Sequence, residues 1–207
     1  MQFIRSIAEL EAIYAQPAEA SVIKVTDHLT PEYHHWIAQS RFCVLSTIGP
    51  EGTDGSPRGD DGPVVLVQDP RSLLMPDWRG NNRMDSLRNI VRDGRVSLMF
   101  LIAGSNTAMR VNGTARLSAD PVILARFDRD GALPRTVIRI TIAEVYSQCA
   151  RALIRARLWQ RAAEPAGLPT VGDMLRGVKA GFDGAAYDAD WPGRAARTMW
   201  ADPTIGA

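Results

Sequence analysis

The sequence predicts a mainly β fold, an antiparallel barrel with helices around it. Six or seven segments have the alternating or β-branched composition of strands, and only short helical segments lie between them. Strands and helices do not alternate regularly, and no internal repeat is visible. A doubly wound nucleotide-binding sheet is not expected, because no GxGxxG segment follows a strand. Neither a Walker motif nor a Gly-x-Ser-x-Gly elbow occurs.

The composition is ordinary for a globular protein. The 207 residues suit one domain with extensions, 45% of them are hydrophobic, and the formal net charge is +1. This charge gives no basic field for nucleic acid, and no apolar run reaches the roughly 18 residues of a membrane span. No secretory signal is visible and Cys43 and Cys149 are far apart, so we expect reduced thiols and a cytoplasmic location.

Residues 1–29 are predicted to form a helical extension. Ser6 and Glu9 match a capping box, and apolar residues follow at helical spacing, so a helix is expected near 6–16. Thr30 and Pro31 then predict a second helix over about 31–40.

Three histidines cluster around this second helix. His34 and His35 are adjacent, so on a helix their side chains point about 100° apart and do not share an ion easily. His28 does not complete a known metal-binding motif with them, and no metal site is expected.

Six segments have the pattern of strands: Phe42–Ile48, Val64–Val67, Ser72–Met75, Arg95–Ile102, Met109–Leu117 and Thr136–Val145. Met109–Leu117 alternates apolar and polar residues, which indicates one buried and one polar face. The polar face fits solvent or an interface, and the pattern alone leaves both open.

The run from Thr53 to Asp60 is different. It contains two glycines and a proline, so its composition favours a loop between neighbouring strands. The alternative is a strand on which Gly59 lets a flat ligand approach the backbone while Arg58 binds its anionic end.

Further helices are predicted in the second half of the chain. Asp120 and Pro121 open a short one that ends near Phe127, and Ser147 is placed to cap a helix over 149–159. Thr170 with Asp173 begins a helix that ends near 180. The tail from Gly181 onward, with Trp200, is expected to be ordered only against the body of the fold or a partner.

The stretch from Asp77 to Ile90 crowds three arginines, three asparagines and a glycine into one segment. If Arg79 and Arg83 shared a helix face they would repel, and an anion between them would relieve this repulsion. Gly80 permits a turn, and Asn81 or Asn82 could cap the helix that follows. The stretch therefore predicts a phosphate cradle made of a helix N-terminus and guanidinium groups. The alternative is a solvated helix with an ordinary charge pattern.

Four blocks in the same order and spacing resemble the pyridoxamine 5′-phosphate oxidase-related flavoproteins. The blocks are Ser56–Asp60, Asp77–Arg83 with Ser86 and Leu87, Arg110–Gly113 and Cys149–Trp159. The resemblance covers roughly residues 30–165, and it is to the FMN-binding branch of unassigned function more than to the true vitamin B6 oxidases.

The resemblance implies a split β-barrel over 30–165 that forms a homodimer and binds FMN in grooves between subunits. Arg58 and Gly59 would line the flavin ring and its polyol tail, and Arg79, Asn82, Arg83 and Ser86 would hold the phosphate. The Arg110 strand and the segment from Gln148 to Trp159 would come from the other subunit or close the pocket. The full set implied to bind the cofactor is Arg58, Gly59, Asp60, Asp77, Arg79, Gly80, Asn82, Arg83, Ser86, Arg110, Gln148, Cys149, Arg151 and Trp159. Residues 166–207 would pack on the barrel or the partner.

The implied activity is an FMN-dependent oxidation of a small molecule by hydride transfer to flavin N5, with no protein acid or base required. The phosphate block and the C-terminal end depart from the true oxidases, so pyridoxamine phosphate is not the expected substrate. The alternatives are an FMN-binding protein without turnover, for storage or sensing, and a barrel of this shape that holds haem or a deazaflavin. An interaction domain with surface arginines is the remaining alternative. Neither nucleic acid nor a membrane is an expected partner.

Overall fold

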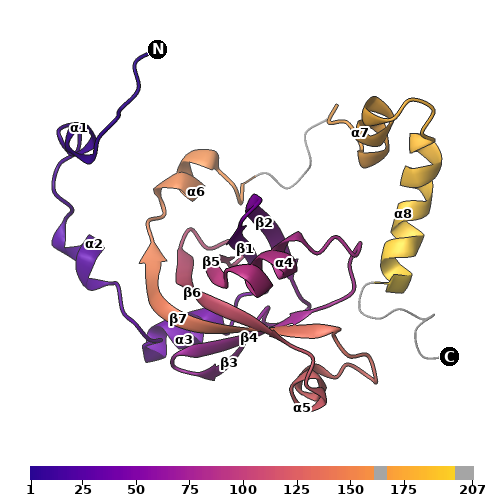
Figure 1. Ribbon diagram of the computed structural model, residues 1–207, viewed down its shortest axis with the longest axis horizontal. Helices are drawn as coiled ribbons and strands as arrows, with labels where there is room; N and C mark the ends of the chain where they lie inside the picture. Colours follow the sequence, from indigo (N-terminus) through magenta and orange to yellow (C-terminus); the bar gives the residue numbers. More distant parts are fainter. Residues whose placement is uncertain (161–166, 199–207) are drawn as a thin grey trace.

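The computed structural model describes residues 1–160 and 167–198, which form one antiparallel sheet of seven strands with helices around it. The strands are β1 Phe42–Gly49, β2 Gly52–Gly59, β3 Leu66–Asp69, β4 Ser72–Asp77, β5 Arg95–Leu101, β6 Ala108–Ser118 and β7 Thr136–Gln148. Figure 1 shows the curled sheet with helices around it and α4 (Asp85–Arg92) in front of it. The end of the predicted tail, including Trp200, lies outside the described residues.

The strand order is β2-β1-β5-β6-β7-β4-β3, so β2 and β3 are the two edges. All pairings between the strands are antiparallel. The predicted antiparallel sheet with peripheral helices is therefore confirmed. Within the described residues no ladder of backbone hydrogen bonds joins β2 to β3, so the sheet itself is not closed into a barrel.

The buried apolar residues form one cluster against the sheet. Alternate residues of β1 and β5 are buried, and Leu45, Leu98 and Phe100 have no exposed surface. Each strand exposes every second side chain to one face, so this alternation is what a half-buried strand requires. Ile37 of α3 and Ile90 of α4 close the same core.

The prediction that residues 53–60 form a loop is wrong. Residues 53–59 belong to β2, which pairs with β1 over its whole length after the turn at Gly49–Gly52, and Asp60 directly follows the strand. Gly52 has a φ of +129°, which L side chains rarely adopt, so this turn needs glycine. Pro57 lies opposite Val44, and its missing N–H is tolerated because β2 is paired on one side only.

Helices α1, α3 and α6 are shorter than the sequence predicts, and α8 was not predicted. Their bounds are α1 Ile7–Glu11, α2 Glu19–Ile23, α3 Pro31–Ile37, α4 Asp85–Arg92, α5 Pro121–Leu124, α6 Arg151–Ala156, α7 Val171–Val178 and α8 Gly184–Thr198. A 3-10 turn, Ala125–Phe127, follows α5. The predicted Ser147 cap is wrong, because Ser147 is paired within β7 and α6 begins after Ala150 without a side-chain cap. The predicted capping box of Thr170 and Asp173 is confirmed at α7.

Helices α7 and α8 pack against each other beside the sheet (Figure 1). A Cβ on Gly172 would meet the Gly184 carbonyl oxygen at 2.1 Å, so only glycines allow this close crossing. The tail, predicted to be ordered only against the body of the fold or a partner, contains a helix from Gly184 to Thr198. No helix in the described part of the chain has the length and apolar character needed to cross a membrane.

Helix α4 packs against β1. The Asn89 amide nitrogen donates to Thr47 Oγ at 3.1 Å, and a Cβ on Gly49 would meet Asn89 Oδ1 at 2.1 Å. The absent side chain at Gly49 therefore lets α4 sit close to the strand. The contact lies in the second half of α4, and the first residues of the same helix line the site described next.

Candidate functional site

Two strands that share no backbone ladder are joined by an ion pair. Arg58 on β2 donates to Asp77 at the end of β4, and only 18% and 15% of the two side chains are exposed. β2 lies at one end of the strand order and β4 near the other. Side chains therefore bring together the two ends of the curled sheet, and we call the gap between these ends the seam.

A second group bridges the seam one residue beyond each strand. Trp78 Nε1 donates to Asp60 at 2.9 Å, and Arg129 donates to the other oxygen of the same carboxylate. The guanidinium carbon of Arg129 lies 5.5 Å from the centre of the Trp78 ring. The Asp60 side chain is 4% exposed, so its charge is held in a mostly dry, fully bonded setting.

A cavity of about 870 Å³ opens along the seam. It is lined by β2, by the loop between β4 and α4, by the first residues of α4 and by the start of β7. Nine of the residues implied to bind the cofactor lie in its wall, namely Arg58, Gly59, Asp60, Asp77, Arg79, Gly80, Asn82, Arg83 and Ser86. The volume lies within the range of pockets for cofactors and other small molecules.

Helix α4 begins later than the sequence predicts. Arg79 and Arg83 both precede it, and neither Asn81 nor Asn82 caps it; the cap position is Met84, which makes no side-chain bond. Asn81 instead accepts from the Arg83 backbone N–H at 2.9 Å, and Asn82 has a left-handed φ of 61°. The first N–H groups of a helix lack intrahelical acceptors, so this uncapped start can donate to an anion.

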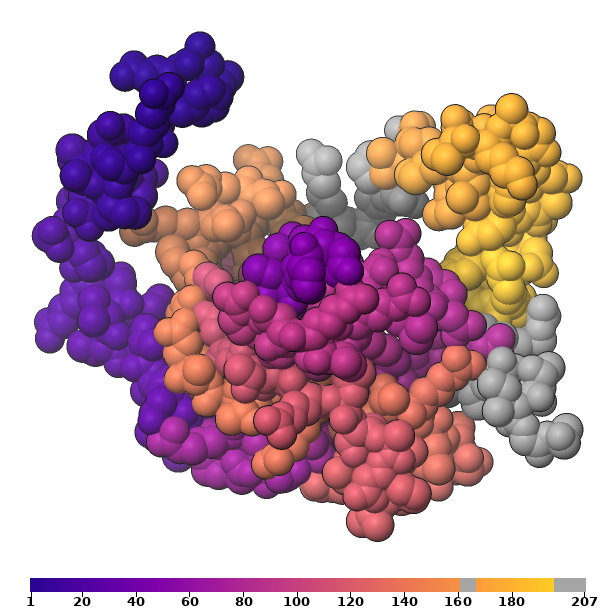
Figure 2. All heavy atoms as spheres, in the orientation of Figure 1, coloured from indigo at the N-terminus to yellow at the C-terminus, as the bar shows by residue number. Residues whose placement is uncertain are grey.

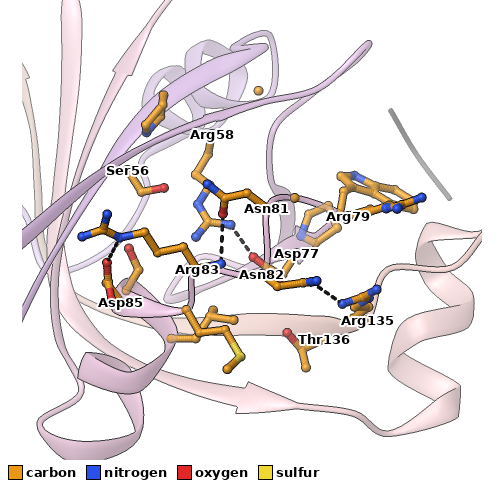
Figure 3. A pocket seen from close by; sticks show the side chains of 18 of the residues that line it. Ser56, Arg58, Asp77, Arg79, Asn81, Asn82, Arg83, Asp85, Arg135 and Thr136 are labelled. Atoms are coloured by element: carbon orange, nitrogen blue, oxygen red, sulfur yellow. Dashed lines mark hydrogen bonds and ion pairs between the residues drawn. The ribbon is translucent and has the colours of Figure 1, made fainter. Parts of the chain in front are cut away.

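The two arginines of the predicted cradle extend to opposite sides of the loop (Figure 3). Arg83 Nε donates to Asp85 at 2.5 Å, and this hydrogen bond raises the pKa of Arg83 further above its usual range. The Arg83 side chain is 79% exposed. Arg79 and Arg83 therefore do not form one shared anion-binding site in this structure. Each guanidinium group lies at a different part of the cavity.

The side of the cavity near Arg79 holds a residue that sequence reasoning missed. Arg135 Nη1 donates to Asn82 Oδ1 at 2.7 Å, and the Arg135 backbone N–H donates to the Asp77 carbonyl at 3.2 Å. Both Arg135 and its neighbour Thr136 line the cavity. Thr136 is the ladder partner of Asp77, so only the strand order, which the sequence did not provide, could have shown this proximity.

Two buried polar atoms in the wall are available to bond a ligand. Arg58 Nε and Thr136 Oγ are buried and have no hydrogen-bond partner among the described residues. A buried donor without an acceptor costs about 1–3 kcal/mol, so such atoms are expected where a ligand completes the bonding. The wall also offers open backbone, since a Cβ on Gly55 would meet nothing within 4 Å.

Gly59 is not required by the packing of a single chain. A Cβ there would meet the nearest atoms, in Arg41 and Phe42, at 3.7 Å, which is an ordinary contact. Because Gly59 has no side chain, this part of the wall leaves room for a ligand that approaches the strand closely.

The remaining implied cofactor residues do not line this cavity. They are Arg110, Gln148, Cys149, Arg151 and Trp159. The Arg110 guanidinium carbon lies 5.4 Å from the Tyr146 ring centre, and Trp159 Nε1 donates to the Ser105 carbonyl at 2.6 Å. One copy of the chain thus carries two separate groups of implied cofactor residues.

Neither a reactive thiol nor a metal centre is evident beside the cavity. Cys43 is the ladder partner of Arg58, but its thiol is fully buried, and burial raises its pKa to about 12. Such a thiol is inert at neutral pH. In the described residues no three histidine, cysteine or acidic side chains gather as a metal site.

Comparison with known proteins places the sequence in a family. Residues 29–149, which is more than half of the chain and contains every strand described above, match the family model for pyridoxamine 5′-phosphate oxidase. The chain belongs to the pyridoxamine 5′-phosphate oxidase family. The resemblance predicted from the four sequence blocks is thereby confirmed. No curated protein matches the chain closely enough to be called a relative.

Solved structures similar to this oxidase-family chain come from several bacteria. HupZ of Group A Streptococcus has 14% identity and a TM-score of 0.47, and the match covers 57% of this chain and 93% of that one. A Lactobacillus delbrueckii protein named after the same oxidase has 25% identity and a TM-score of 0.47, with coverages of 58% and 95%. An FMN-binding protein from Syntrophomonas wolfei has 14% identity and a TM-score of 0.40, with coverages of 56% and 88%. The family assignment rests on the match of residues 29–149.

Proposed function

We propose that the chain binds FMN in the seam cavity and acts as an oxidoreductase on a small molecule. The observation that carries this proposal is the arrangement of the cavity wall: glycine-bearing β2 faces a loop with two arginines and the uncapped start of α4. Flat ring systems need close approach to the backbone, and phosphates need guanidinium groups and free N–H groups. Membership of the oxidase family supports the same choice.

The phosphate end of the ligand would lie at the start of α4. The N–H groups of Asp85 and Ser86 stand at the positive end of the helix dipole, and Arg83 is next to them. Arg83 is bonded to Asp85 on the surface, so a phosphate would compete for it with an exposed carboxylate. Each charge-assisted bond gained in this way stabilises the complex by about 1.5–3 kcal/mol.

The ring would lie along β2. Gly55 and Gly59 leave the strand edge open, and Arg58 Nε provides a buried donor that can bond to a ring carbonyl or nitrogen. Asp77 holds the Arg58 side chain in place, so the donor is preorganised. When bound, FMN supplies the chemistry, which is acceptance of a hydride at N5. The chain positions the ring, excludes water from one face and leaves the other face open to substrate.

The second group of implied residues leads us to propose a homodimer. Arg110, Gln148, Cys149, Arg151 and Trp159 do not reach the cavity of their own copy. In a symmetric dimer the group from one copy would complete the cavity of the other. This arrangement gives the polar face of β6 an interface role, which was one of the two possibilities that the sequence left open.

The test is the spectrum and mass of whatever copurifies with the full chain. We expect a yellow protein with a flavin spectrum, and a released ligand with the mass of FMN. A released dinucleotide, a haem spectrum or a colourless protein that takes up no added FMN would contradict the proposal. Reduction of the bound flavin by NADPH or by a candidate amine, followed by reoxidation, would distinguish an oxidoreductase from a protein that only stores the flavin.

A further inference from the structure

The first 23 residues form an arm that the rest of the chain leaves uncovered. It contains α1 and α2, yet no residue of either helix is buried. Figure 2 shows the arm, in indigo, standing away from the body of the molecule. Its large apolar side chains are exposed: Phe3, Ile4, Ile7, Leu10, Ile13, Tyr14, Val22 and Ile23. Single chains rarely expose so much contiguous apolar surface without a partner for it.

The arm has local structure that its own contacts do not explain. Ser6 accepts from the Glu9 N–H at 3.2 Å, and the Arg5 N–H donates to the Glu9 carboxylate at 2.8 Å, so the start of α1 is capped. Helices of five residues are nevertheless unstable alone in water, because nucleation costs more than a few bonds return. A covering surface is needed to hold them.

The base of the arm is fixed to the sheet. Thr26 and Val145 exchange two backbone hydrogen bonds of 3.0 and 2.7 Å, and Tyr33 donates to the Lys24 carbonyl at 2.7 Å. The Lys24 ammonium lies 5.8 Å from the ring centre of Tyr146, the residue on which Arg110 also stacks. The arm therefore leaves the body beside the face through which we propose that two copies meet.

Helix α6 has the surface that matches the arm. From 151 to 158 the chain exposes three arginines, Arg151, Arg155 and Arg157, and no acidic residue. On the same stretch Ile154 is 56% exposed and Leu158 is 44% exposed. The arm has three glutamates, Glu9, Glu11 and Glu19, against one arginine. An apolar, acidic segment and an apolar, basic one are complementary in both respects.

We propose that the arm of one copy packs on α6 of a second copy, so that the two copies exchange arms across the dimer. We place the contact on the second copy because the arm stands away from its own body and buries none of the residues of α1 and α2 there (Figure 2). This inference rests on the dimer of the proposed function and adds the segment that holds the two copies together.

The experiment uses the full chain carrying Leu10→Cys and Ile154→Cys together with Cys149→Ser, which removes the exposed native thiol. After mild oxidation we expect a covalent dimer on a non-reducing gel, with a disulfide between peptides that carry the two introduced cysteines. A disulfide within one copy would show that the arm folds back on its own α6 and would overturn the proposal. Absence of any disulfide between these two positions would overturn it as well.

A second measurement does not depend on thiols. Leu10→Asp with Ile13→Asp places charge on the apolar side of the arm, and we expect the dimer dissociation constant from sedimentation to rise about ten-fold or more. Gln16→Asp adds charge to the same arm at an exposed polar position and should change it by less than about two-fold. Equal dissociation constants for the two variants would refute the arm contact. A wild-type dimer that never binds flavin would instead refute the proposed function and leave the arm test readable.

Discussion

Arg58 and Asp77 form an ion pair between strands that no backbone ladder connects. The pair stands where the curled sheet would otherwise open, and Asp60 with Trp78 repeats the connection one step further along. The seam is thus held by side chains, and the same side chains form the wall of the cavity. The stability of the sheet and the binding of a ligand should therefore respond to the same residues.

Asp77→Asn should destabilise the fold. The variant removes a charge-assisted bond and leaves the mostly buried Arg58 guanidinium without its counter-charge, so the free energy of unfolding should fall by about 1.5–3 kcal/mol. Urea denaturation measures this directly. Glu51→Gln is the matched control, because its ion pair with Arg92 is largely exposed and should be worth no more than about 0.5 kcal/mol. Equal losses in the two variants would argue against a role of the seam pair in stability.

Arg83→Ala should weaken FMN binding without affecting the fold. Loss of one charge-assisted bond to the phosphate corresponds to an increase of about 10- to 100-fold in the dissociation constant. Titration of flavin fluorescence against the ligand-free protein checks this, and urea denaturation should show unchanged stability because Arg83 is 79% exposed. Arg92→Ala, at the far end of α4, should keep the wild-type affinity. If both variants bind FMN like the wild type, the phosphate does not lie at the start of α4.

Two glycines should respond in opposite ways. Gly59→Val should leave the stability nearly unchanged, because nothing lies closer than 3.7 Å to the added Cβ, but it should weaken FMN binding by filling the wall of the cavity. Gly49→Ala should lower the free energy of unfolding by about 1–3 kcal/mol, because its Cβ would meet Asn89 Oδ1 at 2.1 Å. Thermal melts and flavin titrations of both variants test this. A Gly59→Val protein that unfolds easily, or one that binds FMN normally, would disagree with the structure.

Asp69 should make the stability depend on pH in the acid range. Hydrogen bonds from the Ser72 hydroxyl and then from the Arg71 N–H hold the pKa of Asp69 below its usual value of 3.8. A lowered pKa means that the charged form is favoured in the fold, so the stabilisation is complete above pH 3.8 and is lost as the pH falls through the folded value. Below about pH 4 the melting temperature of the Asp69→Asn variant should therefore depend less on pH than that of the wild type. Parallel pH profiles for wild type and variant would contradict this.

Much of the fold could be predicted from local patterns. The apolar alternation of β6 and the β-branched runs of β1, β5 and β7 located these strands within a few residues, because a half-buried strand must alternate. The caps at Ser6, Thr30 and Thr170 were also predicted correctly, since a cap is decided by a few neighbouring residues.

Features that depend on distant partners could not be predicted in this way. β2 has the composition of a loop, and only its complete ladder with β1 makes it a strand. Arg135 and Arg129 lie far along the chain from Asp77 and Asp60, and the fold brings Arg135 to the cavity wall and Arg129 to the Asp60 carboxylate. The separation of Arg79 from Arg83 follows from the late start of α4, which Met84 begins without the polar cap that the sequence suggested.

The unusual composition of β2 has a consequence for solubility. An unpaired strand edge presents donors and acceptors that can recruit a strand from another molecule, and proteins counter this with prolines, glycines and charges on such edges. β2 carries Pro57, the glycines Gly55 and Gly59 besides Gly52, and the charged residues Asp54 and Arg58 on its inward side. The residues that make β2 look like a loop in the sequence are therefore also the residues that oppose aggregation through this strand edge. Replacing them with ordinary β-formers would make the edge more regular and the protein more prone to form fibrils.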